Sequence, residues 1–108
     1  DVARLTDIEA VKRAVRNSVL TNQFERPFHL EIGRSVRDLL FESITPLNAV
    51  LLEDRIREVI VNFEPRAELD AIQVFDEIDN NQYRVTINFK VVSSPEPVTI
   101  TEFLQRLR

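Results

Sequence analysis

The chain has 108 residues, a length that suits one domain with one modest hydrophobic core. Its net charge of −4 and pI near 5.0 argue against a nucleic-acid binder and against a basic membrane-surface helix. No apolar run approaches the roughly 20 residues that a bilayer-spanning helix needs, and the absence of cysteine excludes a disulfide framework or a thiolate metal site.

The first predicted element is an amphipathic helix over residues 7–20. Thr6 and Glu9 have the spacing of a capping box, in which both side chains satisfy free backbone N–H groups at a helix start. One helical face is aliphatic and consists of Ile8, Val11, Val15 and Val19. Three basic residues lie largely opposite, Lys12, Arg13 and Arg16. They fit either an anion site or a solvated face, and we favour the solvated face.

The segment 21–33 is predicted to be irregular, because Arg26-Pro27 and Gly33, the one glycine of the chain, interrupt it. A short helix is expected next, on the spacing of Val36, Leu39 and Leu40, and it should end near Phe41-Glu42.

A long helix is predicted over residues 46–63. Thr45 is a good cap, and Pro46 suits the first helical position. The helix should stop at Glu64, because a proline disfavours helical backbone at the residue before it. Glu64, Pro65 and Arg66 therefore form a rigid corner that carries a carboxylate and a guanidinium. A guanidinium is always charged and suits carboxylates and carbonyl groups. Such a corner either braces the fold from within or grips a partner.

After the corner the hydrophobic period changes from helical to two. Ile72 and Val74 mark one strand, and residues 79–81 form a turn rich in residues that tolerate left-handed backbone. Residues 83–91 alternate apolar and polar side chains, which is typical of a half-buried strand. The tail from Val98 suits a helix or a strand, and its β-branched start favours a strand.

Together these elements predict a small single α+β domain over residues 1–108. About three helices should precede a three-stranded, mainly antiparallel sheet.

Catalytic and metal-binding patterns are nearly absent from the sequence. His29 is the only histidine and lies between apolar residues in the irregular segment, where an ordinary loop histidine is the better interpretation. A glycosidase would need two carboxyl groups across a cleft, for which the candidates are Glu25, Glu31, Glu42 and Glu64. With no Trp and one Tyr the chain offers few sugar-binding platforms. We therefore predict no catalytic residue, metal or cofactor, and a small muralytic hydrolase is the weaker alternative.

Five motifs occur in a fixed order: Phe24-Glu25-Arg26-Pro27-Phe28, Glu31-Ile32-Gly33, Leu40-Phe41-Glu42, Thr45-Pro46-Leu47 and Asn62-Phe63-Glu64-Pro65-Arg66. Their order and spacing cover nearly all of residues 7–108 and resemble the baseplate wedge protein family of contractile-tailed phages. Relatives of that family include a baseplate subunit of type VI secretion systems. The N-terminal tryptophan and leucine features common in those relatives are not seen here, which favours a phage or phage-derived tail.

The resemblance implies a structural role in the baseplate of a virion tail, assembled in the host bacterial cytoplasm. In the family, the corner that matches Glu64, Pro65 and Arg66 docks on a helical core bundle of larger wedge subunits. We assign partner binding to these three residues and to Arg26 and Pro27 of the matching irregular segment. Other baseplate proteins are further expected partners. Members of this family are often called lysozymes, and the residues of this chain give that description no support.

The resemblance also implies that the strand-rich half initiates sheath polymerisation. In the family, arms of the first ring of tail sheath subunits add strands to this sheet, so at least one edge of the sheet over residues 67–108 should be open. An open edge is usually protected by charge, proline or twist. The protecting residues expected around the last strand are Pro95, Pro97, Glu102, Arg106 and Arg108.

Overall fold

The computed structural model describes the backbone of residues 2–24, 36–92 and 94–107. Side chains are described for residues 7–19, 36–92 and 94–107. Three helices come first: α1 (Val2–Phe24), α2 (Val36–Leu40) and α3 (Pro46–Phe63). Three strands follow: β1 (Ala67–Glu77), β2 (Gln82–Val91) and β3 (Pro97–Gln105). A short 3₁₀ turn, η1 (Ile78–Asn80), joins β1 to β2. The predicted α+β order of a small single domain is confirmed. The segment that holds Arg26, Pro27, His29 and Gly33 lies outside the described residues.

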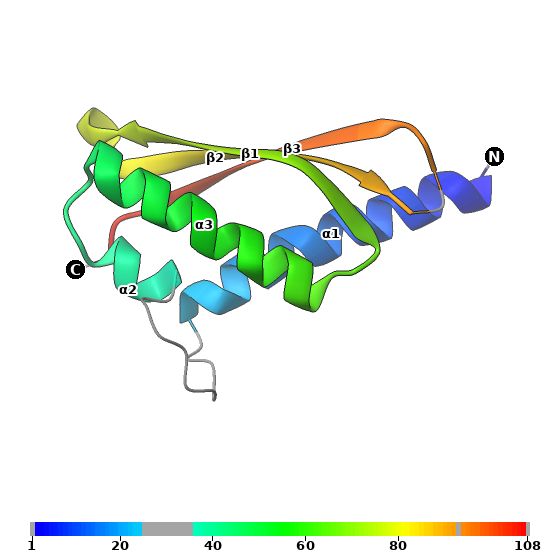
Figure 1. The fold of residues 1–108 in the computed structure, drawn as a ribbon, viewed down its shortest axis with the longest axis horizontal. Coiled ribbons are helices and arrows are strands. Elements are labelled where there is room, and N and C mark those ends of the chain that lie inside the picture. Colours follow the sequence, from blue (N-terminus) through cyan, green and yellow to red (C-terminus); the bar gives the residue numbers. More distant parts are fainter. Residues whose placement is uncertain (1, 25–35, 93, 108) are drawn as a thin grey trace.

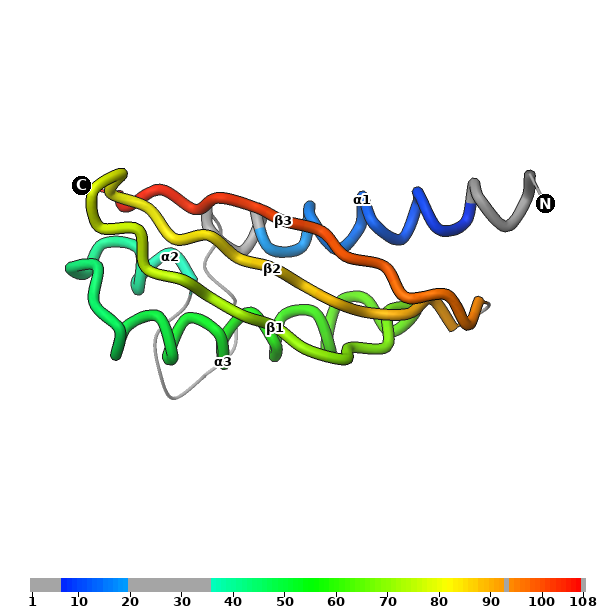
Figure 2. The backbone as a smooth tube through the Cα atoms, turned by 90° about the horizontal axis from the view of Figure 1, so that it is seen from above, coloured from blue at the N-terminus to red at the C-terminus, as the bar shows by residue number. Residues whose placement is uncertain are grey.

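The fold has two layers (Figure 1), with the helices packed on one face of a sheet in the order β1-β2-β3. Both strand pairs are antiparallel, and strands that follow one another in the sequence lie side by side in the sheet. Seen from above the sheet, α3 runs along the β1 side and α1 runs along the β3 side (Figure 2). The core lies between the helices and the inner face of the sheet. Because only one face is covered, side chains must alternate along each strand.

Helix α1 is longer than the sequence predicted. It begins at Val2, so Thr6 lies inside the helix and the predicted capping box is wrong. The residues before Thr6 continue the helical backbone, and the spacing of a capping box also occurs within helices. Glu9 instead lies 3.5 Å from Lys12, one turn away. The predicted aliphatic face is confirmed, because Val11, Val15 and Val19 are completely buried.

Helix α3 has the predicted bounds, and its two ends explain them. Thr45 has extended backbone, and its Oγ1 accepts the N–H of Asn48 at 3.1 Å, with Pro46 in the first turn. At the other end the N–H of Glu64 donates to the carbonyl of Ile60 at 2.9 Å and closes the last turn. The buried face of the helix consists of Ala49, Leu52, Ile56, Val59 and Ile60.

The central strand β2 alternates as predicted, with inward side chains that are all buried: Tyr83, Val85, Ile87, Phe89 and Val91. Before it, Asn81 adopts the left-handed conformation with φ of 56°. Asparagine reaches that region at low cost because its side chain is short and polar. The turn predicted at residues 79–81 is therefore confirmed.

The two outer strands differ from each other. Strand β1 shifts its register between Leu69 and Ala71, which leaves Asp70 as a bulge. Strand β3 pairs with β2 over its whole length without a shift, and the tail is a strand as expected. After β3 the N–H of Leu107 donates to the carbonyl of Leu40 at 2.7 Å and ties the tail to α2. Among the described residues neither outer strand has a further strand beside it, so the predicted open edge is confirmed.

Candidate functional site

The corner between α3 and β1 is built by three consecutive residues. Pro65 lacks an N–H and restricts Glu64 to non-helical backbone, which is observed at φ −140° and ψ 75°. The carbonyl of Glu64 then accepts the N–H of Ala67 at 3.1 Å. This bond closes a tight turn, and the chain enters β1 directly. The backbone of the corner is thus fixed on both sides by regular structure.

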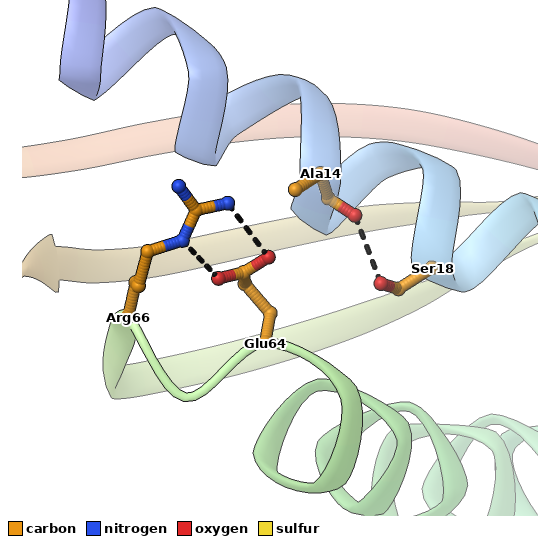
Figure 3. Close-up of polar contacts among 4 residues, drawn as sticks. All are labelled: Ala14, Ser18, Glu64 and Arg66. Atoms are coloured by element: carbon orange, nitrogen blue, oxygen red, sulfur yellow. Dashed lines mark hydrogen bonds and ion pairs between the residues drawn. The ribbon is translucent and has the colours of Figure 1, made fainter.

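Glu64 and Arg66 are paired with each other (Figure 3). The Nε of Arg66 donates to Oε1 of Glu64 at 2.7 Å, and its Nη2 donates to Oε2 at 3.2 Å. Glu64 is 6% exposed, whereas the side chain of Arg66 is 51% exposed. Both carboxylate oxygens therefore serve the pair, while the guanidinium still faces solvent with its remaining N–H donors, including those of Nη1.

The pair is electrostatically favourable for both residues. The hydrogen bond from Arg66, helped by its positive charge, lowers the pKa of Glu64, although burial of the carboxylate acts in the opposite direction. The same hydrogen bond raises the pKa of Arg66, with a smaller contribution from the charge of Asp7 on α1. Glu64 is thus ionised at neutral pH and acts as a fixed acceptor that orients the arginine.

Helix α1 passes beside this pair and presents small side chains there (Figure 3). Ser18 donates its hydroxyl to the carbonyl of Ala14 at 2.9 Å, so its polar group is satisfied within the helix. Ala14 and Ser18 were not identified from the sequence as part of the site. Their spacing of four residues places them on the same flank of α1. Small residues at such positions are common in helices, so the sequence alone does not mark them as part of a site.

A shallow hollow of about 510 Å³ lies beside Pro65, where α3 meets the start of β1. Its lining is Arg57, Val61, Pro65, Ala67, Glu68 and Leu69. Val61 and the nearby Phe63 are well exposed for apolar side chains. Exposed apolar side chains that gather on one part of a surface are typical of protein-binding sites.

The predicted site residues are thus only partly placed. The structure brings Glu64, Pro65 and Arg66 together, whereas Arg26 and Pro27 lie outside the described residues. Of the four candidate glycosidase carboxylates, Glu25 and Glu31 also lie outside them, and Glu42 is exposed after α2. Within the described ranges no three acidic, histidine or cysteine side chains cluster to hold a metal. None of the helices described is long and apolar enough to cross a membrane.

Three comparisons with known proteins bear on the family and the fold of this chain. The family model of baseplate wedge protein gp25 matches residues 6–96. The chain is 33% identical over 98 residues to baseplate wedge protein gp25 of Enterobacteria phage T4, covering 91% of this chain and 74% of that protein. Its fold is similar to a crystal structure of a candidate tail lysozyme from Geobacter sulfurreducens, with a TM-score of 0.75, 21% identity and coverage of 93% and 91% of the two chains. At that identity the crystal structure supports the fold alone.

Proposed function

This chain belongs to the baseplate wedge protein family, and we propose that it is a non-enzymatic component of a contractile-tail baseplate that docks through the Glu64–Arg66 corner and templates the sheath. In this proposal the partners are the wedge subunits that build a helical core bundle, the tail sheath subunit and other baseplate proteins. Assembly takes place in the host cytoplasm, and the finished protein lies in the baseplate of the virion tail.

The observation that carries the docking proposal is the paired corner. Glu64 is buried and each of its two oxygens accepts a hydrogen bond from Arg66, so in this proposal it orients the arginine rather than meeting the partner. Arg66 then offers its outward N–H donors to carbonyl or carboxylate groups at helix ends of the partner bundle. Pro65 and the apolar side chains around the hollow supply the surrounding contact area.

Retention of purified wedge subunits on the immobilised chain tests this proposal. We expect the wild-type chain and Arg13→Ala, an exposed control on α1, to retain them equally, and Arg66→Ala to retain much less. Removing one partner of a desolvated charged contact typically costs roughly 2–5 kcal/mol of binding. If neither wedge nor sheath subunits are retained by the wild-type chain, the proposed role is wrong.

The templating proposal rests on the open sheet. A sheet edge offers unpaired backbone N–H and carbonyl groups that can pair with an extended segment of another chain. In the proposal, arms of the first sheath ring add strands there and start polymerisation. Sheath polymerisation on purified baseplates with and without this chain is the direct test, and normal polymerisation without it would contradict the proposal.

A muralytic hydrolase is the alternative, and the electrostatics of Glu64 disfavour it. A glycosidase needs one carboxyl group whose pKa is raised so that it can act as an acid near neutral pH. The pKa of Glu64 is lowered instead, and its oxygens are occupied by Arg66. We expect purified protein to clear no peptidoglycan. Clearing that Glu64→Gln abolishes and an exposed Glu58→Gln retains would establish the hydrolase.

A further inference from the structure

The two edges of the sheet are unequally protected against strand addition. Natural proteins block exposed edges with bulges and charged side chains. Strand β1 has both, because its register is broken at Asp70 and because it carries four acidic residues, Glu68, Asp70, Asp76 and Glu77. An added strand along β1 would meet an interrupted row of hydrogen-bonding groups and a dense negative charge.

Strand β3 has neither protection over most of its length. All nine of its residues pair with β2 in continuous register. Its single charged residue, Glu102, is already neutralised by Arg16 of α1, whose Nε lies 2.8 Å from Oε1 of Glu102. The β-branched run at residues 98–101 favours the extended backbone that an added strand would pair with.

Both ends of β3 are held in place, so the edge is preorganised. Pro97 begins the strand, as suits an edge position. Beyond its end the N–H of Arg106 donates to the carbonyl of Asn81 at 3.0 Å, and Leu107 is bonded to α2. Little ordering of β3 is therefore needed before it can pair. The sequence predicts five protecting residues around this strand. Pro95, Pro97 and Arg106 lie outside the stretch 98–104, Glu102 is paired with Arg16, and Arg108 is not among the described residues.

Helix α1 places positive charge beneath this edge. It runs alongside β3 (Figure 2), and Arg16 reaches Glu102 from it. Lys12 lies one turn earlier on the same side of the helix and is partly buried, and its ammonium group lies 3.5 Å from the exposed carboxylate of Glu9. A strand added to β3 would therefore lie over α1, with its helix-facing side chains near the ammonium group of Lys12. A carboxylate at such a position would share or take over the contact that Lys12 makes with the exposed Glu9, and a basic residue would be repelled.

We propose that the outer edge of β3, over residues 98–104, is the acceptor to which an extended segment of the tail sheath subunit pairs, with an acidic side chain turned toward Lys12. This inference rests on the proposed templating function and adds which edge is used and what chemistry the added strand carries.

Hydrogen–deuterium exchange of the full chain, alone and with purified sheath subunit, tests the choice of edge. We expect amides in β3 to gain at least about tenfold protection on addition of sheath, since strand pairing buries the outward N–H groups, and amides of β1 to change little. Protection confined to β1 would overturn the choice of edge and leave templating intact. Protection of neither strand would overturn both.

Proline variants give a second, independent reading. Successive residues of an antiparallel strand direct their N–H groups alternately to the two sides, so one of Thr101→Pro and Glu102→Pro removes an outward donor and the other removes a bond to β2. Melting identifies the outward variant, because it unfolds near the wild-type temperature. That variant should not seed sheath polymerisation while still binding wedge subunits. Normal seeding by it would overturn the choice of β3, and if both variants unfold early the exchange measurement decides.

The charge of the added strand is tested on α1. Lys12→Glu should weaken binding of the sheath subunit by about fivefold, the upper range for one partly exposed ionic contact. Arg13→Glu makes the same charge change at an exposed position of the same helix and should have little effect. Equal weakening by both variants, or by neither, would overturn the acidic contact at Lys12.

Discussion

Arg66 and Glu64 are two residues apart and are joined by two hydrogen bonds across the corner that Pro65 makes, with the carboxylate buried and the guanidinium half exposed. This asymmetry gives the two residues different tasks. The glutamate fixes the direction of the arginine, and the arginine presents its free donors outward. The pair braces the corner within the chain, and the proposed grip on a partner is compatible with that role because the outward donors of Arg66 are not used by Glu64.

Replacing Glu64 by glutamine should affect the fold as well as binding. Glu64→Gln removes the negative charge and one of the two acceptors of the pair, so we expect the free energy of unfolding to fall by about 1 kcal/mol. Urea denaturation measures this change. Asp54→Asn, which alters an exposed carboxylate on α3, is the matched control and should leave stability nearly unchanged. An unaltered midpoint for Glu64→Gln would show that the pair does not brace the corner.

The same pair makes stability depend on pH in acid. The folded-state pKa of Glu64 lies below its ordinary value of 4.5, so the carboxylate contributes stability that is fully present above pH 4.5 and is lost as the pH falls through the lowered value. The stability difference between wild type and Glu64→Gln should therefore be constant near neutral pH and shrink below pH 4.5. Urea midpoints measured across this range for both proteins test it. A difference that grows as the pH falls would contradict the lowered pKa.

Enlarging the small side chains of α1 should displace the corner. In Ala14→Leu the added carbon atoms compete with the paired side chains for space, and overpacking of this kind typically costs about 1–3 kcal/mol. Asn17→Leu is the control, because Asn17 lies exposed on the same helix. Thermal melting of both variants measures the effect. Equal melting temperatures for Ala14→Leu and wild type would show that α1 leaves more room at the corner than we infer.

Loss of the α3 cap should weaken the element that positions the corner. Thr45→Ala removes the acceptor for the N–H of Asn48, which typically costs about 1 kcal/mol. Thr45→Ser keeps a hydroxyl group and should retain most of the stability. Chemical denaturation of the two variants gives the comparison. If serine fails to rescue the alanine variant, the hydroxyl contact is not the source of the effect.

Much of the fold follows from local signals in the sequence. Thr45-Pro46 and Pro65 bound α3 because caps and prolines act on their immediate neighbours, and the alternation at residues 83–91 directly reflects a sheet covered on one face. Signals that depend on distant residues were less reliable. The spacing of Thr6 and Glu9 fits a helix start, but both residues lie within α1. No local sequence pattern in β1 predicts the bulge at Asp70.

The site shows the same division between local and distant causes. The corner at Glu64-Pro65-Arg66 follows from the proline, but whether the charges pair with each other or with another chain depends on what surrounds them. The contact between Arg16 and Glu102 joins residues that are 86 positions apart in the sequence. No periodic pattern encodes such a pair. Ala14 and Ser18 matter because they are small, a property that leaves no distinctive signal in a single sequence.

The central claim is that Arg66 docks this chain on the wedge while Glu64 holds it in place. The most direct measurement is the affinity of the purified chain for its wedge partners, compared between wild type, Arg66→Lys and Arg66→Ala, with thermal melting of each isolated variant. We expect Arg66→Lys to bind weakly, because lysine cannot form the paired hydrogen bonds and still present a second set of donors, and Arg66→Ala to bind more weakly still while remaining folded. Wild-type affinity in Arg66→Ala would contradict the claim, as would a loss of melting temperature large enough to explain the lost binding.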